Sequence, residues 1–153
     1  MRTFIASGFG AGLLWEKLFG VKKGGGSFAS IIFVGVIYLL KLEIIWLLLL
    51  FFALTILYFY AVDDVHAASD PSWITLDEIV GMSLASLASP SQLLPLITGF
   101  IIFRASDILK QPTIVAKMEE LPGKKGVLYD DLAAGAFGLL GATIVSQFVN
   151  LSL

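Results

Sequence analysis

The chain has 153 residues, of which 58% are hydrophobic and 14% charged, and its net charge is −2. This composition is typical of an integral membrane protein with a single domain, residues 1–153. The charge balance gives no basis for nucleic-acid binding, and the absence of cysteine excludes disulfides, thiolate metal sites and a cysteine nucleophile. The lone histidine, His66, rules out a multi-histidine zinc site.

The N-terminal segment, residues 3–14, is apolar but carries three alternating glycines, Gly8, Gly10 and Gly12. Glycines at this density make a poor spanning helix and favour a backbone that turns or packs closely. We therefore expect a short re-entrant or interfacial piece here. The stretch Lys22 to Ser27 follows and is predicted to form a basic, glycine-rich loop.

Five further apolar runs predict an all-α, polytopic membrane bundle of about five membrane helices. The run Ile44 to Val62 is the clearest span, because about 20 apolar residues are needed to cross the hydrocarbon core. The other four runs are residues 28–40, 74–88, 93–103 and 132–153. In the last run, Ala134, Gly138 and Ala142 recur at four-residue spacing, which predicts close packing between helices.

The segment Ser89-Pro90-Ser91-Gln92 decides whether the acidic residues can meet. If residues 74–103 formed one span, Asp77 and Asp107 would lie on opposite sides of the bilayer. Proline with serine is a turn signal, so we expect a helical hairpin that returns both acids to one face. The hairpin also places most basic residues on that face, with Lys41 opposite, and the positive-inside rule makes the face cytoplasmic.

Acidic residues stand at three ends of apolar runs: Asp77 with Glu78, Asp107 after Arg104, and Asp130 with Asp131. A charge at membrane depth costs roughly 2.5–3.5 kcal/mol on insertion scales, so an acid there marks a functional site. Carboxylates without histidine or cysteine indicate a hard cation, and magnesium takes oxygen ligands that it shares with substrate phosphate. The sequence therefore predicts a magnesium site with the ligands Asp77, Glu78, Asp107, Asp130 and Asp131.

Basic and small residues near these acids predict an anionic substrate. Arg104 could fork onto two phosphate oxygens, Lys110 could act as a point charge, and the amides around Gly26 and Ser27 could cradle phosphate. Arg104, Asp107 and Gln111 have the spacing of one helix face. The set predicts metal-assisted hydrolysis of a phosphate ester, in which a carboxylate either activates water or attacks phosphorus.

Other roles stay open for the same residues. Asp130 and Asp131 are expected in the first turn of the last helix, where the helix dipole favours anions, and Asp77 with Glu78 can serve as a helix cap. Arg104 with Asp107 can be a structural ion pair. The alternative function is a small membrane transporter or channel subunit that uses the clustered acids as an ion path.

Six segments occur in a fixed order along nearly the whole chain: Gly8–Gly12, Gly26-Ser27, Asp70, Asp77–Met82, Phe103–Pro112 and Gly126–Gly135. Together they resemble the phosphatidylglycerophosphatase A family. In the first loop, only Gly26 and Ser27 match the family's usual Pro-Gly-Thr-x-Gly-Ser segment. The matched positions are Asp77, Glu78, Arg104, Asp107, Lys110, Asp130 and Asp131, with Asp70 a weaker match.

The resemblance implies a magnesium-dependent lipid phosphatase that converts phosphatidylglycerophosphate to phosphatidylglycerol. It implies a multi-pass protein of the bacterial cytoplasmic membrane, with its site on the cytoplasmic face. The expected catalytic residues are Asp77, Glu78, Arg104, Asp107 and Asp131. The expected partners are the phospholipid substrate and the lipid bilayer.

Overall fold

A computed structural model describes the chain except residues 21–22, 68–70, 89 and 152–153, so Lys22 and Asp70 lie outside the described residues. The described residues form helices and no strand, which confirms the predicted all-α class. The α-helices are α1 (Arg2–Ala6), α2 (Ala11–Phe19), α3 (Gly25–Leu40), α4 (Ile44–Ala61), α5 (Asp64–Ala67), α6 (Leu76–Ala85), α7 (Leu93–Leu109), α8 (Thr113–Glu119) and α9 (Lys124–Leu151).

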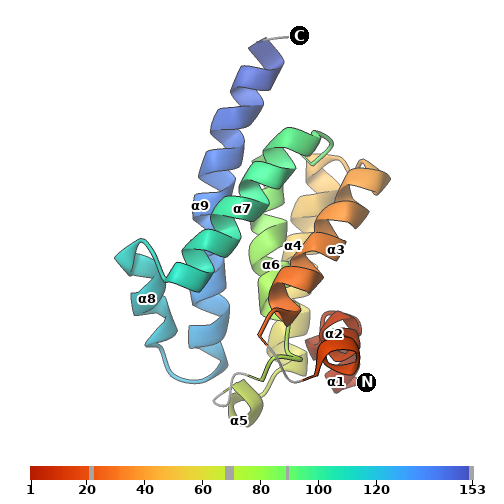
Figure 1. Ribbon diagram of the computed structural model, residues 1–153, viewed down its shortest axis with the longest axis vertical. Helices are drawn as coiled ribbons and strands as arrows, with labels where there is room; N and C mark the ends of the chain where they lie inside the picture. Colours follow the sequence, from red (N-terminus) through yellow and green to blue (C-terminus); the bar gives the residue numbers. More distant parts are fainter. Residues whose placement is uncertain (21–22, 68–70, 89, 152–153) are drawn as a thin grey trace.

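Helix α6 is the centre of the bundle, and α3, α4, α7 and α9 all pack against it (Figure 1). Eight of its ten residues are buried, because neighbouring helices cover it on most sides. Its length corresponds to only about 15 Å at the rise of an α-helix. It is therefore a core helix that carries polar side chains into the bundle.

Small residues bring α9 close to α6 and α7. A Cβ on Gly135 would lie 2.4 Å from the carbonyl oxygen of Gly81, and a Cβ on Gly138 would lie 2.8 Å from that of Gly99. Both distances are too short for a side chain, so only glycine allows these backbone contacts. The packing predicted from the small residues of the last helix is therefore confirmed.

Helices α6 and α7 form the predicted hairpin. A 3-10 turn over residues 86–88 follows α6, and α7 then returns in the opposite direction (Figure 1). Asp77 near the start of α6 and Asp107 near the end of α7 consequently line the same cavity. A single span over residues 74–103 is excluded.

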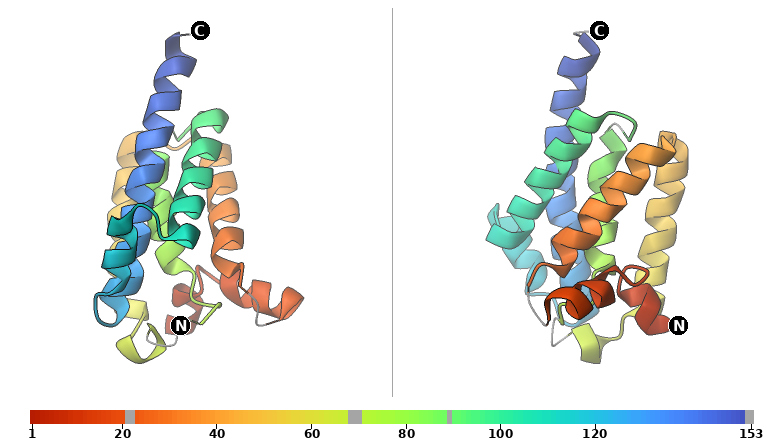
Figure 2. Two further views of the ribbon diagram at one scale, coloured as in Figure 1. Left: turned by 60° about the vertical axis from the view of Figure 1, so that its left-hand side comes forward. Right: turned by 45° about the vertical axis from the view of Figure 1, so that its right-hand side comes forward.

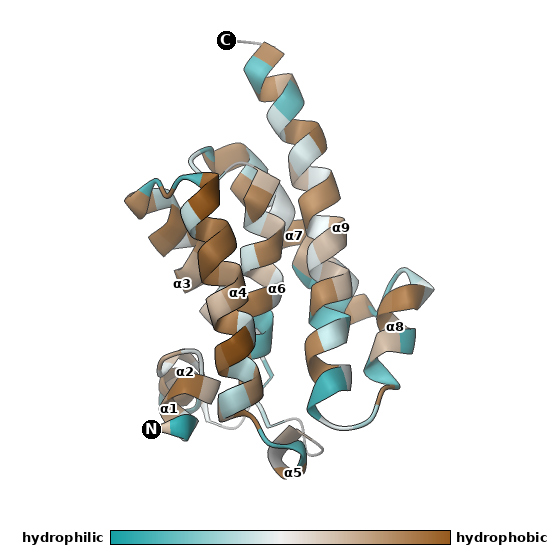
Figure 3. Cartoon of the chain, turned by 180° about the vertical axis from the view of Figure 1, so that it is seen from behind, coloured by the Kyte–Doolittle hydropathy of each residue, from teal (hydrophilic) through white to brown (hydrophobic). Residues whose placement is uncertain are grey.

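Two helices among the described residues are long and apolar enough to cross a membrane, α4 and α9. Helix α3 is apolar but has 16 residues, and α6 has ten. The prediction of about five membrane helices is therefore not confirmed by length and composition. Many hydrophilic residues gather at the end of the bundle that carries α5 and α8, as Figure 3 shows.

Three local predictions were wrong. Gly25 to Ser27 form the first turn of α3 and not a loop, because Gly24, with φ of 132°, makes the chain reversal before it. Helix α9 begins at Lys124, directly after the turn at Gly123, so Asp130 and Asp131 lie beyond its first turn. Helix α7 ends at Leu109, and Gln111 lies beyond it, off the helix face of Arg104.

Candidate active site

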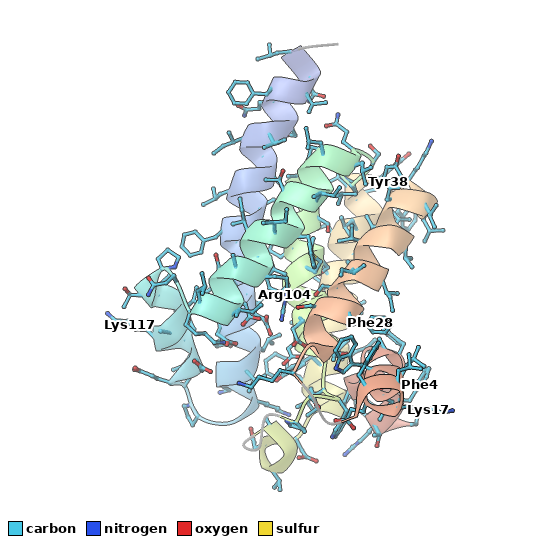
Figure 4. The ribbon with its side chains drawn as sticks, viewed as in Figure 1. Phe4, Lys17, Phe28, Tyr38, Arg104 and Lys117 are labelled. Atoms are coloured by element: carbon cyan, nitrogen blue, oxygen red, sulfur yellow. The ribbon has the colours of Figure 1, made fainter. Side chains whose placement is uncertain are left out.

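A cavity of about 700 Å³ opens between the start of α3, the start of α6, the end of α7 and the first turns of α9. Figure 4 shows Arg104 pointing from α7 toward α3 in this region. All nine residues predicted from the sequence as catalytic, metal-binding or phosphate-binding line the cavity: Gly26, Ser27, Asp77, Glu78, Arg104, Asp107, Lys110, Asp130 and Asp131.

Three carboxylates form the centre of the site, which we call the carboxylate triad: Asp77, Glu78 and Asp131. One oxygen from each lies within 4.8 Å of the others. Asp77 and Asp131 are each 4% exposed. The close contact of α6 and α9 produces this arrangement, because Gly81 lies one helical turn after Asp77 and packs against the carbonyl oxygen of Asp131.

The triad has the chemistry of a cation site. Glu78 Oε2 and Asp131 Oδ1 are both buried, and neither accepts a hydrogen bond from the described residues. Buried carboxylates are normally paired, hydrogen-bonded or bound to a metal. Oxygen ligands in a set without nitrogen or sulfur fit magnesium. The residues present therefore fit the cation that the sequence predicts.

Arg104 borders the triad and is held by contacts from three sides. Its Nη1 lies 2.9 Å from Asp107 Oδ2 and 4.0 Å from Glu78 Oε1. Its Nε donates a hydrogen bond to Ser27 Oγ at 3.2 Å. These contacts fix the plane of the guanidinium at the wall of the cavity, which suits the two-point recognition of a phosphate group.

Lys110 lies at the end of α7, among acidic side chains. Its Nζ is 3.1 Å from Asp107 Oδ1 and 3.7 Å from Glu119 Oε1, and it also forms an ion pair with Asp130 Oδ2. Burial alone would lower the pKa of Lys110, but the hydrogen bond and charge of Asp130 and the charge of Asp107 outweigh it and raise the pKa. Lys110 therefore remains a cation at neutral pH.

The five predicted metal ligands consequently fall into two groups. Asp77, Glu78 and Asp131 converge on one point, whereas Asp107 and Asp130 form ion pairs with Arg104 and Lys110. The second group neutralises and positions the two cations that face the cavity. The geometry therefore separates a candidate metal site from a candidate phosphate site.

The glycine at the start of α3 leaves room for a triad member. A Cβ on Gly26 would lie 1.8 Å from Glu78 Oε1. The sequence predicts a phosphate-binding role for this glycine, but in the structure its lack of a side chain allows the carboxylate of Glu78 to approach α3. The next residue, Ser27, contributes the hydroxyl that accepts the hydrogen bond from Arg104.

Glu119 also lines the cavity, although the sequence does not predict it as a site residue. It is the last residue of α8 and lines the cavity beside Lys110. Its position depends on how α8 packs against α9, and no local pattern in an exposed, charged stretch distinguishes it from Glu120.

The comparisons with known proteins agree on one kind of chemistry. A family model described as phosphatidylglycerophosphatase A matches residues 4–146. A Bacteroides thetaiotaomicron protein named "Putative phosphatidylinositol-3-phosphatase" is 34% identical over 150 residues, which cover 90% of this chain and 89% of that protein. No solved structure matches the chain. The family match extends from α1 into α9 and contains every residue of the cavity.

Proposed function

The chain belongs to the phosphatidylglycerophosphatase A family, and we propose that it is a magnesium-dependent membrane phosphatase that converts phosphatidylglycerophosphate to phosphatidylglycerol. The family supports a phosphatase that acts on a phospholipid. The observation that carries the proposal is the cavity in which the carboxylate triad, Arg104 and Lys110 meet. Three carboxylates without a bound cation would repel the phosphate group of a substrate. The triad therefore needs a metal ion if the cavity is to bind and hydrolyse a phosphate ester.

In this proposal Asp77, Glu78 and Asp131 hold the magnesium ion. A bound magnesium ion would supply Lewis-acid polarisation of the phosphoryl group. We propose Asp107 and Asp130 as positioning residues, in place of the ligand role that the sequence predicts for them, because each is paired with a cation.

Arg104 and Lys110 act on the phosphoryl group. The guanidinium binds two of its non-bridging oxygens, and the ammonium neutralises charge that develops as the phosphorus–oxygen bond to the leaving alcohol breaks. A carboxylate of the cavity either takes a proton from the attacking water or attacks phosphorus itself. In the first route, the oxygen of water forms the new bond to phosphorus, the bond from phosphorus to the leaving oxygen breaks, and the proton taken by the carboxylate passes to that oxygen. In the second route, a carboxylate oxygen displaces the alcohol to form an acyl phosphate, which water then hydrolyses to inorganic phosphate and the free carboxylate.

We propose a multi-pass location in the bacterial cytoplasmic membrane, with the cavity at the cytoplasmic face. The two candidate spans and a phospholipid substrate support membrane association. Lys23 and Lys110 line the cavity, and Lys124 and Lys125 begin α9 at the same end of the bundle. Basic residues favour the cytoplasmic side of a membrane protein.

The transporter or channel alternative has no support from the family or the relative. An ion path requires polar residues through the middle of the membrane. Helix α4, which is the most apolar of the candidate spans, contains no Asp, Glu, Lys, Arg or His along its whole length.

The proposal is tested by phosphate release from purified protein in nanodiscs. Three lipids are compared: phosphatidylglycerophosphate, phosphatidylinositol 3-phosphate and phosphatidic acid. We expect release from phosphatidylglycerophosphate that needs magnesium and stops in excess EDTA, with zinc a poor substitute because the triad offers only oxygen ligands. Preference for phosphatidylinositol 3-phosphate would replace the proposed substrate, and undiminished release in chelator would overturn the metal assignment.

A further inference from the structure

Helices α1 and α2 and the turn between them carry apolar side chains that the rest of the described chain leaves uncovered: Phe4, Phe9, Leu13, Leu14 and Leu18 are all exposed. The rings of Phe4 and Phe9 stack edge to face at 6.3 Å. Lys17 lies among the exposed leucines and is exposed itself, where a long aliphatic stem can cover apolar surface while the ammonium reaches water. Such a surface is unfavourable in water and fits the boundary between lipid headgroups and acyl chains.

The two helices lie across the bundle at the level where α4 ends (Figure 2). Helix α1 packs against α4, and the guanidinium of Arg2 lies 5.0 Å from the ring centre of Tyr60, close to the end of that candidate span. Tyrosine is enriched at membrane–water interfaces. If α4 spans the bilayer, α1 and α2 lie parallel to the membrane plane at its surface.

This element is fastened to the walls of the phosphatase cavity. Thr75 N, just before α6, donates a hydrogen bond to the carbonyl oxygen of Ala6 at 3.1 Å. Ser72 Oγ, which lines the cavity, donates to Glu16 Oε1 at 2.6 Å. The ring of Trp15 covers Gly24, where a Cβ would lie 2.5 Å from Trp15 Cζ2. The depth of α2 in the membrane therefore sets the depth of the start of α3.

An apolar groove of about 490 Å³ continues the same surface beneath the turn that joins the two helices. Phe9 and Leu14 form one wall, and residues of α3 and α4 such as Val36 and Leu57 form the others. The exposed face of α2 is thus continuous with the candidate membrane surface of the bundle.

We infer that α1 and α2 form an in-plane membrane anchor, embedded at the headgroup–acyl boundary of the bilayer, that holds the polar cavity level with the lipid headgroups. Lipid covers the exposed apolar face of α1 and α2. The anchor places a lipid phosphate, which cannot leave the headgroup layer, at the height of Arg104 and Lys110.

The test uses spin labels on the full chain in nanodiscs, because a protein without cysteine accepts one label at each introduced cysteine. Labels are placed at Leu13→Cys and Leu18→Cys on the exposed face of α2. Phe52→Cys, exposed in the middle of α4, is the deep control, and Glu120→Cys, exposed after α8, is the aqueous control. Accessibility to oxygen and to a nickel chelate gives the depth of each label.

We expect both α2 labels about 5–10 Å below the headgroups, shallower than Phe52 and protected from the nickel chelate. Accessibility equal to that of Glu120 would overturn the anchor, and a depth equal to that of Phe52 would make the segment re-entrant. Dipolar broadening between labels at Leu18 would show that a second copy covers the face and would also overturn it. The measurement does not depend on catalysis, so its result stands apart from that of the phosphatase assay.

Discussion

At the scale of single residues, the acids of the cavity differ in what they already bind. Asp107 and Asp130 contact guanidinium or ammonium groups, whereas buried oxygens of Glu78 and Asp131 accept no hydrogen bond from the described residues. A buried anion without a partner is costly. In the proposed mechanism, the triad is therefore the part of the site whose stability and chemistry depend most on a bound cation.

Asp131→Asn removes one negative charge from the triad with little change in shape. We expect the variant to fold and to lose a hundredfold or more in kcat/KM, on the scale of a removed electrostatic group. The magnesium concentration that gives half-maximal activity should also rise, which a magnesium titration of the same assay measures. Glu120→Gln removes one negative charge in the same way at an exposed position outside the cavity and should behave like wild type. A folded, fully active Asp131→Asn protein would refute the metal role.

Arg104→Lys keeps the charge but loses the planar fork. If the guanidinium binds two phosphate oxygens, lysine cannot replace it, and we expect kcat/KM to fall by roughly a hundredfold. Arg2→Lys is the matched control, because Arg2 is the other arginine of the chain and lies outside the cavity. Nearly full activity of Arg104→Lys would show that Arg104 serves only as an ion-pair partner of Asp107.

At the scale of elements, the glycines at the start of α3 serve helix packing. Gly24 makes the turn before the helix, and a Cβ on Gly25 would lie 2.4 Å from the carbonyl oxygen of Ser72. Gly26 lies against Glu78 in the same way. These glycines therefore allow the start of α3 to pack directly against the segment before α6 and against the carboxylate of Glu78.

Gly26→Ala and Gly35→Ala form a matched pair on α3. Alanine favours a helix over glycine by roughly 0.5–1 kcal/mol at both positions. A Cβ at position 35 meets open space, whereas at position 26 it meets the carboxylate of Glu78. We expect Gly35→Ala to keep activity with an equal or higher Tm, and Gly26→Ala to lose activity at least tenfold as Glu78 is displaced. Equal activities in a kinetic assay would contradict the placement of Glu78.

At the scale of the whole molecule, the hairpin of α6 and α7 determines where the polar residues lie. It brings the end of α7 beside the start of α6, and α9 then adds Asp130 and Asp131 at the same end. The short connection between α3 and α4, which contains Lys41, lies at the opposite end of the bundle (Figure 1). The two ends should therefore face different compartments in a membrane.

Single cysteines report this orientation in intact cells. We expect Val65→Cys and Glu120→Cys, both exposed at the cavity end, to react with an impermeant thiol reagent only after the membrane is opened. Lys41→Cys should react from outside. Labelling of Val65→Cys and Glu120→Cys from opposite sides would refute the shared cytoplasmic face, because the structure places α5 in contact with α9.

The sequence determined the helical class, the clearest candidate span, the hairpin and nine of the residues that line the cavity. These follow from local chemistry: apolar length, turn residues, and acids next to basic residues at the ends of apolar runs. The family resemblance drawn from the ordered motifs is confirmed by the match over residues 4–146. Helix starts were less predictable, since α9 extends through a charged stretch that carries no apolar signal.

Only the tertiary structure decided how the acids divide. Asp107, Asp130 and Asp131 are equivalent in a sequence, because each is an aspartate near a membrane end. The contact between Gly81 and Asp131 draws one of them into the triad, while Arg104 and Lys110 reach the other two. Metal binding and ion pairing depend on distances of a few ångströms between helices, which local pattern does not encode.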